Sequence, residues 1–293
     1  MAKVRKAVIP AAGFGTRFLP MTKASPKEML PVVDKPIIQR VVEELVGAGI
    51  EDIIIVTGYH KRSIEDHFDA PSSELTQMLK NKPEMLLKVE KIGKLANFAY
   101  VRQKGPYGNG TPLLNVRHLV GNEPFIYTWG DDFVEAAPVT RFAQMVECYE
   151  KYGATTLSCI RATRNQDYVK YGFASGKKLA EGVIEVEKIV EKPGKENAPS
   201  DLATVSGFLA APEIFEYVDQ AASGLQPGHE FYYNDVLKLM LLAGKKIIAR
   251  EIENARFYDT GDKLDYLKAV VEFGIKHEDI GEEFSKWIGG LKV

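Results

Sequence analysis

The segment best suited to chemistry lies near the N-terminus, where two cations follow a glycine-rich turn. The turn occupies residues 12–17 (AGFGTR) and comes directly after the apolar residues 7–9. Glycines after a strand allow backbone N–H groups to approach a phosphate or a base edge. Taken alone, this Gly-x-Gly fits a ligand-free tight turn equally well, because neither a dinucleotide fingerprint nor a Walker A loop is complete.

The continuation of this segment favours a ligand site. Arg17 and Lys27 place two cations beside the turn. Prolines at positions 20, 26 and 31 make the chain between and after them stiff and non-helical. A solvated run of charges is not usually held in this way, so we expect the two cations to be fixed beside an anionic ligand.

Acidic residues in two distant segments are candidate metal ligands. Asp131 and Asp132 follow the apolar residues 124–128, and a parallel sheet binds its ligands beyond such strand ends. Carboxylates there suit Mg²⁺, which usually takes one or two of them besides phosphate oxygens and water. A turn or a helix N-cap explains the pair equally well. Asp259, in the sequence YDTGD, taken alone indicates a turn.

The elements that must position these residues alternate between strand and helix. Apolar or β-branched runs predict strands at residues 7–9, 53–57, 98–101, 124–128, 155–160 and 246–251. Helices are predicted at residues 37–48, 139–151, 231–243 and 263–276, and a helix plus loop at residues 75–95. Between residues 172 and 207 short β-like pieces predict a mixed or antiparallel excursion. Continuous apolar strands are typical of a parallel sheet covered by helices.

Composition excludes several classes of protein. The chain has 293 residues and a formal net charge of -2, without the basic excess of a nucleic-acid binder. No segment approaches the length of a membrane span, and the apolar stretch near the N-terminus is too short for a signal peptide. We therefore expect a cytoplasmic protein that binds neither nucleic acid nor membranes.

Several motifs together resemble one enzyme family. Residues 13–20 (GFGTRFLP), 22–23 (TK) and 26–36 (PKEMLPVVDKP) are similar to the signature of sugar-nucleotide pyrophosphorylases, and most of all to bacterial UTP–glucose-1-phosphate uridylyltransferases. Further matching segments follow in the family's order, at residues 102–104, 130–132, 171–172, 190–193 and 258–263. The resemblance covers almost the whole chain. It implies an α/β, Rossmann-like nucleotidyltransferase fold: a mixed, mostly parallel central sheet flanked by helices, with a small β-rich sugar-binding subdomain.

The resemblance also implies a reaction and its organisation. A nucleotidyl group moves from a nucleoside triphosphate to a sugar-1-phosphate with the help of Mg²⁺, and the first expectation is UTP and glucose-1-phosphate. Residues 1–293 are expected to form a single domain, in which residues 1–165 mainly bind nucleotide, residues 166–262 mainly bind sugar phosphate, and residues 263–293 are a C-terminal helical segment. The partners are then small molecules, and relatives are often dimers or tetramers.

Site residues follow from the resemblance position by position. The catalytic residues are Arg17, Lys27 and Lys192, and the metal ligands are Asp131 and Asp259. The nucleotide-binding residues are Ala11, Ala12, Gly13, Gly15, Thr16, Glu28, Gln103, Gly108 and Asp132. The sugar-binding residues are Tyr171, Gly172, Glu191 and Lys192. Without the resemblance, the Glu191-Lys192-Pro193 sequence is typical of a surface strand end.

Four segments depart from the uridylyltransferase pattern. The family's GLGHA is replaced by GNGTP at residues 108–112, and its LPDD by WGDD at residues 129–132. Its GRY is SGF at residues 206–208, and its acidic helix start is HEFYYND at residues 229–235. These changes affect base and sugar recognition, so a thymidylyl- or cytidylyltransferase acting on a hexose-1-phosphate is the alternative.

A non-catalytic regulatory paralogue is the alternative from another class. Such a protein would be free to lose at least one of the charged residues of the mechanism. All five are present here, namely Arg17, Lys27, Asp131, Lys192 and Asp259, and their retention argues against it.

Overall fold

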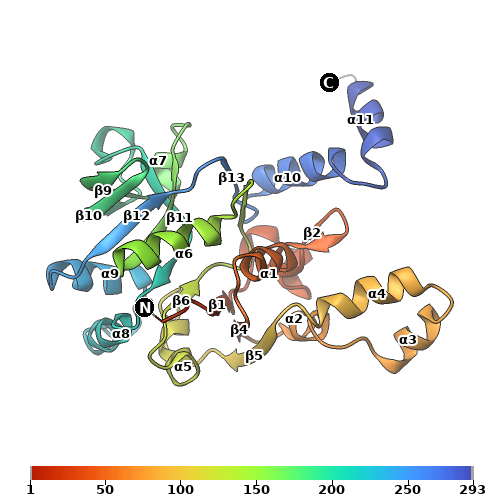
Figure 1. Cartoon of the computed structure of the whole chain (residues 1–293), viewed down its shortest axis with the longest axis horizontal. Coiled ribbons are helices and arrows are strands. Elements are labelled where there is room, and N and C mark those ends of the chain that lie inside the picture. The colour runs from red at the N-terminus through yellow and green to blue at the C-terminus, as the bar shows by residue number, and fades with distance from the viewer. Residues whose placement is uncertain (1, 292–293) are drawn as a thin grey trace.

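The computed structural model describes residues 2–291 and is built around a nine-stranded mixed sheet (Figure 1). The strands lie in the order β5-β4-β1-β6-β11-β8-β12-β10-β9. Strands β5, β4, β1 and β6 are mutually parallel, and only β10 and β11 run against the other strands of this sheet. The mixed, mostly parallel sheet expected from the sequence is confirmed. Six strands of this sheet are β1 (Lys6–Ala11), β4 (Asp52–Thr57), β5 (Asn97–Arg102), β6 (Phe125–Tyr127), β8 (Thr155–Arg161) and β12 (Ile247–Glu251).

The central strands are buried on both faces, and each face has its own apolar core. In β1, Ala7 and Ile9 face one core and Val8 faces the other, because successive side chains of a strand point to opposite faces. The first core is covered by α1 (Ile37–Gly47) and α6 (Arg141–Tyr152). The second is covered by α5 (Thr111–Val120), α8 (Ile214–Ser223) and α9 (Tyr233–Leu242).

The antiparallel excursion between residues 172 and 207 is confirmed. It consists of β9 (Gly172–Ala180), β10 (Val183–Glu191) and β11 (Leu202–Ala210), and each pairs antiparallel with its neighbours. These strands extend the central sheet, and β11 lies between β6 and β8. The β-rich part of the chain therefore shares its hydrogen-bonded framework with the N-terminal part.

Four helices were not predicted, and one begins later than expected. Helices α2 (Arg62–His67), α5, α7 (Asp167–Lys170) and α8 lie outside the helical ranges expected from the sequence. Helix α9 begins at Tyr233 instead of residue 231, because the backbone of Phe231 is hydrogen-bonded to a distant loop: its N–H to the Tyr107 carbonyl at 2.7 Å and its carbonyl to the Gly110 N–H at 2.8 Å.

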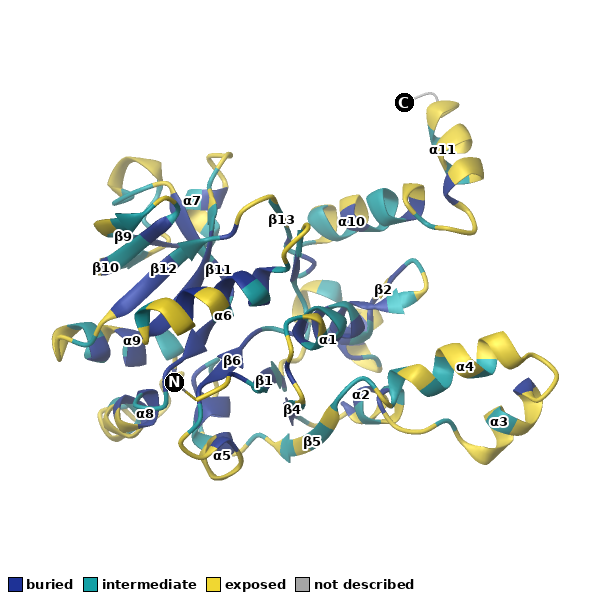
Figure 2. Cartoon of the chain, viewed as in Figure 1, coloured by how far each residue is buried: buried dark blue, intermediate teal, exposed yellow. Residues whose placement is uncertain are grey.

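Smaller elements project from this body. Helices α2 (Arg62–His67), α3 (Ser73–Leu79) and α4 (Pro83–Ile92) form one projection, and α10 (Lys263–Ile275) and α11 (Gly281–Gly289) form another (Figure 1). Figure 2 shows broad exposed faces on α3, α4 and α11, in contrast to the buried central strands. A two-stranded sheet pairs β7 (Phe133–Ala136) with β13 (Ala255–Tyr258). Among residues 2–291 no helix combines the length and apolarity needed to span a bilayer.

The parallel strands end at the same edge of the sheet, and their following loops lie there. The loop after β1 carries the glycine turn and Arg17, and the segment after β6 carries Asp131. Between them the stiff stretch forms three short 3₁₀ turns, Thr16–Phe18, Met21–Lys23 and Lys27–Met29, and no α-helix. This edge is where a sheet of this type binds its ligands.

Candidate active site

A cleft of about 1060 Å³ opens at this edge of the sheet. It gathers residues from the glycine turn, the ends of β4 and β5, and the segments that follow β6 and β13. Twelve of the predicted site residues line it: Ala12, Gly13, Arg17, Lys27, Glu28, Gln103, Gly108, Asp131, Asp132, Tyr171, Lys192 and Asp259. The fold therefore brings together residues that are far apart in the sequence.

Lys27 and Asp131 form the central ion pair of the cleft. Lys27 Nζ lies 2.5 Å from Asp131 Oδ2, and each side chain is about a quarter exposed or less, at 26% and 20%. Burial opposes the charged form of Lys27, but the carboxylates of Asp131 and Glu28 outweigh it and raise the pKa of the ammonium. Lys27 therefore stays charged in a partly dry cleft that suits an anion.

Asp131 and Asp259 face a common point beside Gly261. A carbon placed on the Gly261 Cα would lie 3.5 Å from Asp131 Oδ2 and 3.3 Å from Asp259 Oδ1. It would also lie 3.1 Å from Arg17 Nη1, which donates a hydrogen bond to the Gly261 carbonyl at 3.3 Å. Glycine at this position keeps the space between the two carboxylates and the guanidinium open.

The two carboxylates fit the demands of Mg²⁺. No cluster of three or more His, Cys, Asp or Glu side chains suited to a metal occurs in residues 2–291. Mg²⁺ is commonly held by one or two carboxylates together with substrate phosphates and water, so a larger cluster is not required. Burial raises the pKa of Asp259, while Lys170 and Arg17 lower it. The Tyr171 hydroxyl donates to Asp259 Oδ2 at 3.3 Å.

Asp132 is held separately from Asp131. Its Oδ1 accepts a short hydrogen bond from Ser206, a residue with a left-handed φ of 55°. Burial and the neighbouring Asp131 raise the pKa of Asp132 to about 8. The carbonyl of Ser206 in turn accepts from the buried guanidinium of Arg141 at 3.3 Å. The sequence motif places Asp132 beside the metal ligands, but the fold turns it toward β11.

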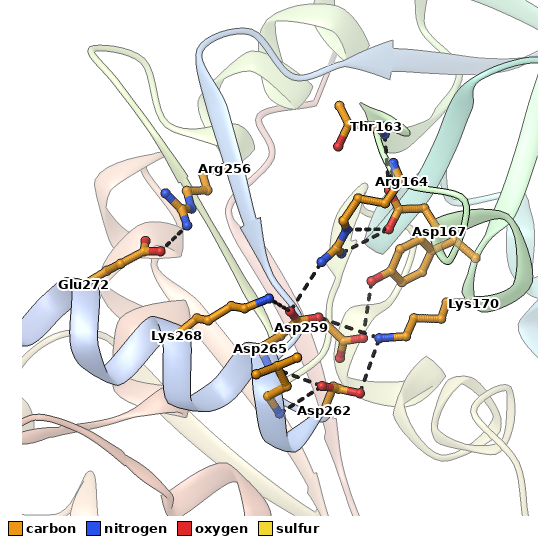
Figure 3. A network of polar contacts seen from close by, with 12 residues as sticks. Thr163, Arg164, Asp167, Lys170, Arg256, Asp259, Asp262, Asp265, Lys268 and Glu272 are labelled. Atoms are coloured by element: carbon orange, nitrogen blue, oxygen red, sulfur yellow. Dashed lines mark hydrogen bonds and ion pairs between the residues drawn. The ribbon is translucent and has the colours of Figure 1, made fainter. Parts of the chain in front are cut away.

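A charge network supports the Asp259 side of the cleft (Figure 3). Lys170, at the end of the short helix α7 (Asp167–Lys170), lies 3.3 Å from Asp262 and 3.6 Å from Asp265. Arg164 lies 3.0 Å from Asp167 and 3.4 Å from Asp265. The network joins α7 to the start of α10 and thereby fixes both segments around Asp259.

The predicted sugar-binding residues lie where β10 ends and the neighbouring strand β9 begins. Lys192 follows this strand with a φ of 46°, and its N–H donates to the Tyr171 carbonyl at 3.0 Å. Lys192 and Tyr171 line the cleft, whereas Gly172 and Glu191 do not. A Cβ on Gly172 would lie 2.9 Å from both Glu191 Oε2 and Thr204 Oγ1, so a larger residue would displace these side chains.

Three of the predicted nucleotide-binding residues do not line the cleft. Ala11 is the buried last residue of β1 and pairs with Thr57 of β4. Gly15, with a φ of 65°, packs on Lys27, because a Cβ there would lie 3.1 Å from Lys27 Cβ. Thr16 begins the first 3₁₀ turn. These three residues support the geometry of the turn.

The comparisons with known proteins give a consistent answer. A model of the family described as nucleotidyl transferase matches residues 6–274. The chain belongs to the nucleotidyl transferase family. It is 43% identical over 296 residues to UTP–glucose-1-phosphate uridylyltransferase 2 of Staphylococcus saprophyticus, with 100% of both chains covered. It is 41% identical to the uridylyltransferase of Streptococcus pyogenes, with 98% of this chain and 94% of that protein covered.

Solved structures of the family superpose on this nucleotidyltransferase over nearly its whole length. A UDP-glucose pyrophosphorylase complexed with UDP-glucose gives a TM-score of 0.81 at 38% identity, covering 94% of this chain and 100% of that chain. A UTP-bound enzyme from Acinetobacter baumannii gives a TM-score of 0.87 at 33% identity, covering 99% and 100%. The Rossmann-like nucleotidyltransferase fold expected from the motifs is confirmed.

The departures from the uridylyltransferase pattern contact one another in this nucleotidyltransferase. The loop at residues 108–112 is hydrogen-bonded to the segment at residues 229–235: the Tyr233 N–H donates to Asn109 Oδ1 at 3.1 Å. The ring of Tyr233 lies 5.5 Å from Trp129 and 5.3 Å from Phe208. Four changes that are scattered in the sequence therefore form one packed unit beside the cleft.

Gly108 has a packing role besides the predicted one. We expected it to bring backbone close to the base. A Cβ on Gly108, whose φ is 122°, would lie 2.1 Å from the Phe231 carbonyl oxygen. Only glycine allows this backbone contact, so packing against Phe231 explains the residue even though it also lines the cleft.

Glu28 is fully buried beside the cleft and is paired with Lys61. Its Oε2 accepts from Lys61 Nζ at 2.7 Å, and the two side chains are 0% and 6% exposed. Oε1 has no hydrogen-bond partner, and no other carboxylate in residues 2–291 has a buried oxygen in this state. Burial raises the pKa of Glu28, and Lys61 and Lys27 oppose this shift. An unpaired buried acceptor costs about 1–3 kcal/mol.

Several residues that line the cleft were not among the predicted site residues. The wall of the cleft also contains Tyr59, Tyr107, Trp129, Lys170, Glu230 and Asp262. Tyr59 and Tyr107 are 75% and 68% exposed, although exposed tyrosines have no pattern that separates them from ordinary surface residues. Lys170 could have been considered, because it directly precedes the Tyr171-Gly172 motif.

Proposed function

We propose that this protein transfers the uridylyl group of UTP to glucose-1-phosphate and releases UDP-glucose and pyrophosphate. The observation that carries the proposal is the convergence of Arg17, Lys27, Asp131, Lys192 and Asp259 on one cleft of about 1060 Å³. Relatives at 41–43% identity over their full length are named UTP–glucose-1-phosphate uridylyltransferases. The regulatory alternative is disfavoured because every charged group of the mechanism is present.

The reaction is an in-line displacement at the α-phosphorus. A non-bridging oxygen of the sugar-1-phosphate attacks, a new phosphorus–oxygen bond forms, and the bond to the bridging oxygen of pyrophosphate breaks. The protein contributes position and charge stabilisation and no covalent intermediate. Arg17 and Lys27 stabilise the triphosphate and the departing pyrophosphate. Lys192 holds the attacking phosphate against the repulsion between two anions.

Asp131 and Asp259 would hold the Mg²⁺ ion. When bound, the ion offsets negative charge on the α-phosphate, which lowers the barrier to attack by an anion. Gly261 supports this assignment, since the absence of a side chain leaves room between the two carboxylates. Tyr171 and Lys170 keep Asp259 in place.

Base recognition would use Gln103, the backbone at Ala12 and Gly13, and Glu28. Uracil and thymine carry an N–H at ring position 3, where cytosine carries a lone pair. The unpaired Oε1 of Glu28 is an acceptor suited to such an N–H, which supports UTP over CTP. A buried polar group left unpaired by the wrong ligand discriminates strongly.

The enzyme would act in the cytoplasm as a homo-oligomer. Leu264 and Leu267 on α10 and Trp287 on α11 are each 58–61% exposed, and large exposed apolar side chains are typical of subunit contacts. Light scattering of the purified protein tests this proposal, and a mass of one chain would contradict it.

A substrate panel tests the proposed function. Pyrophosphate release is measured with UTP, TTP, CTP, ATP and GTP, each with glucose-1-phosphate and with other hexose-1-phosphates. We expect the highest kcat/KM with UTP and glucose-1-phosphate. Higher kcat/KM with TTP or CTP would favour the alternative reaction, and no release with any pair would favour the regulatory paralogue.

A further inference from the structure

We propose that Lys61 is a positioning residue for base selection, which acts by holding Glu28 Oε2 so that Oε1 remains the acceptor offered to the nucleotide base. The inference rests on the proposed function and assigns a role to a residue that the sequence patterns did not single out. Lys61 does not line the cleft, so its effect passes through Glu28.

Both charged side chains of the pair are shielded from water. Lys61 Nζ donates to Glu28 Oε2 at 2.7 Å, and the lysine side chain is only 6% exposed. In this setting solvent cannot compensate for a lost contact, and the ammonium decides which carboxylate oxygen stays free. A carboxylate without this partner could rotate or bind a proton, and it would then no longer be a fixed acceptor.

The backbone around Lys61 is built to bring it under Glu28. A Cβ on Gly58 would lie 2.9 Å from the Ala12 carbonyl oxygen, so the loop after β4 packs directly on the glycine turn. His60 has a left-handed φ of 61°, a conformation that non-glycine residues adopt only where the surrounding structure enforces it. The Lys61 carbonyl then accepts from the Ile64 N–H at 3.0 Å and starts α2.

The neighbouring charges have other partners. Lys27, which directly precedes Glu28 in the sequence, is bound to Asp131 at 2.5 Å. Gly130 permits the approach of Glu28, since a Cβ there would lie 3.3 Å from Glu28 Cγ. The cleft also contains Ala12, Gly13 and Gln103, whose backbone and amide groups can form hydrogen bonds with a base.

The test is the ratio of kcat/KM for UTP to that for CTP, measured with glucose-1-phosphate. In Glu28→Gln, Lys61 binds the amide oxygen and turns the NH₂ group toward the base, where it suits the lone pair of cytosine. We expect the ratio to fall by at least about a hundredfold. In the Glu28→Gln/Lys61→Met double variant the amide is released and can present either its oxygen or its NH₂ group to the base. The double variant should therefore favour neither base, with a UTP-to-CTP ratio near one.

Lys61→Met alone should lower the ratio at least about tenfold and leave the KM for glucose-1-phosphate unchanged. The double variant has no unpaired buried charge, so it serves as the test if Lys61→Met does not fold. Lys35→Met, which removes a half-exposed lysine paired with Glu43 at 3.0 Å outside the cleft, is the matched control and should keep the wild-type ratio.

Two outcomes would overturn the inference: a folded Lys61→Met protein with the wild-type ratio, or equal ratios for Glu28→Gln and the double variant. These outcomes differ from a failure of the proposed function. In that case the wild-type protein itself would not form UDP-glucose from UTP.

Discussion

Lys27 Nζ lies 2.5 Å from Asp131 Oδ2, although 104 residues separate the two in the sequence. The proposed reaction gives them different partners, the triphosphate for the lysine and Mg²⁺ for the aspartate. In the ligand-free protein each neutralises the other, so neither buried charge is left unpaired. The pair therefore keeps both groups in place before substrates bind.

Replacing Lys27 should affect turnover far more than folding. Lys27→Ala removes charge stabilisation that is needed mainly in the transition state, so kcat should fall by roughly 10²–10³-fold. Steady-state kinetics with UTP and glucose-1-phosphate measure this effect, and circular dichroism checks the fold. Lys3→Ala, which alters an exposed lysine paired with Glu51, is the control. Wild-type turnover of a folded Lys27→Ala protein would show that the assigned role is wrong.

Removing the metal, or one of its ligands, should change the Mg²⁺ requirement. Chelation with EDTA should abolish activity, and added Mg²⁺ should restore it. Asp131→Asn and Asp259→Asn should each raise the Mg²⁺ concentration for half-maximal rate by at least about tenfold. Asp66→Asn, which changes an exposed aspartate paired with Arg62, should behave as wild type. Full activity in EDTA would contradict the proposed metal site.

The buried Arg141–Glu44 pair should be important for stability. Arg141 Nη2 lies 2.9 Å from Glu44 Oε2, and the side chains are 0% and 10% exposed. Arg141→Met leaves a buried carboxylate without its partner, which should lower the free energy of unfolding by about 3–5 kcal/mol. Urea denaturation measures the change.

Arg117 provides the matched control for that experiment. It pairs with Asp219, and both side chains are more than half exposed. Arg117→Met should cost less than about 1 kcal/mol, because surface ion pairs contribute little. Equal losses for the two variants would show that burial of the pair does not determine its importance.

Gly108 should tolerate substitution much less well than Gly121. Both have a positive φ, of 122° and 67°, but a Cβ on Gly121 would meet no atom within 4 Å. Gly121→Ala should therefore cost only the backbone strain, about 1–3 kcal/mol. Gly108→Ala adds the clash with Phe231 and should cost roughly 1–3 kcal/mol more. Thermal and urea unfolding give both values, and the KM for UTP should rise only in Gly108→Ala. Equal losses for the two variants would contradict the packing role of Gly108.

The sequence by itself determined most of the local structure. The apolar runs at residues 7–9 and 53–57 and the helical period at residues 37–48 specify β1, β4 and α1, because these patterns depend only on which neighbours share a face. The motifs around Arg17 and Lys27 also indicated the family and the reaction class, through their resemblance to the signature of sugar-nucleotide pyrophosphorylases. Helices α2, α5, α7 and α8 were missed, and α5 has a proline at the start of its first turn.

Only the tertiary structure decided which distant segments meet. The loop at residues 108–112 contacts the segment at residues 229–235, and β11 lies between β6 and β8, and no local pattern encodes either arrangement. The same holds for Gly261, which lies between Asp131 and Asp259, and for Lys61 under Glu28. Such contacts depend on how whole layers pack, because a side chain's partner across the core is set by sheet order and register, and these depend on the entire chain.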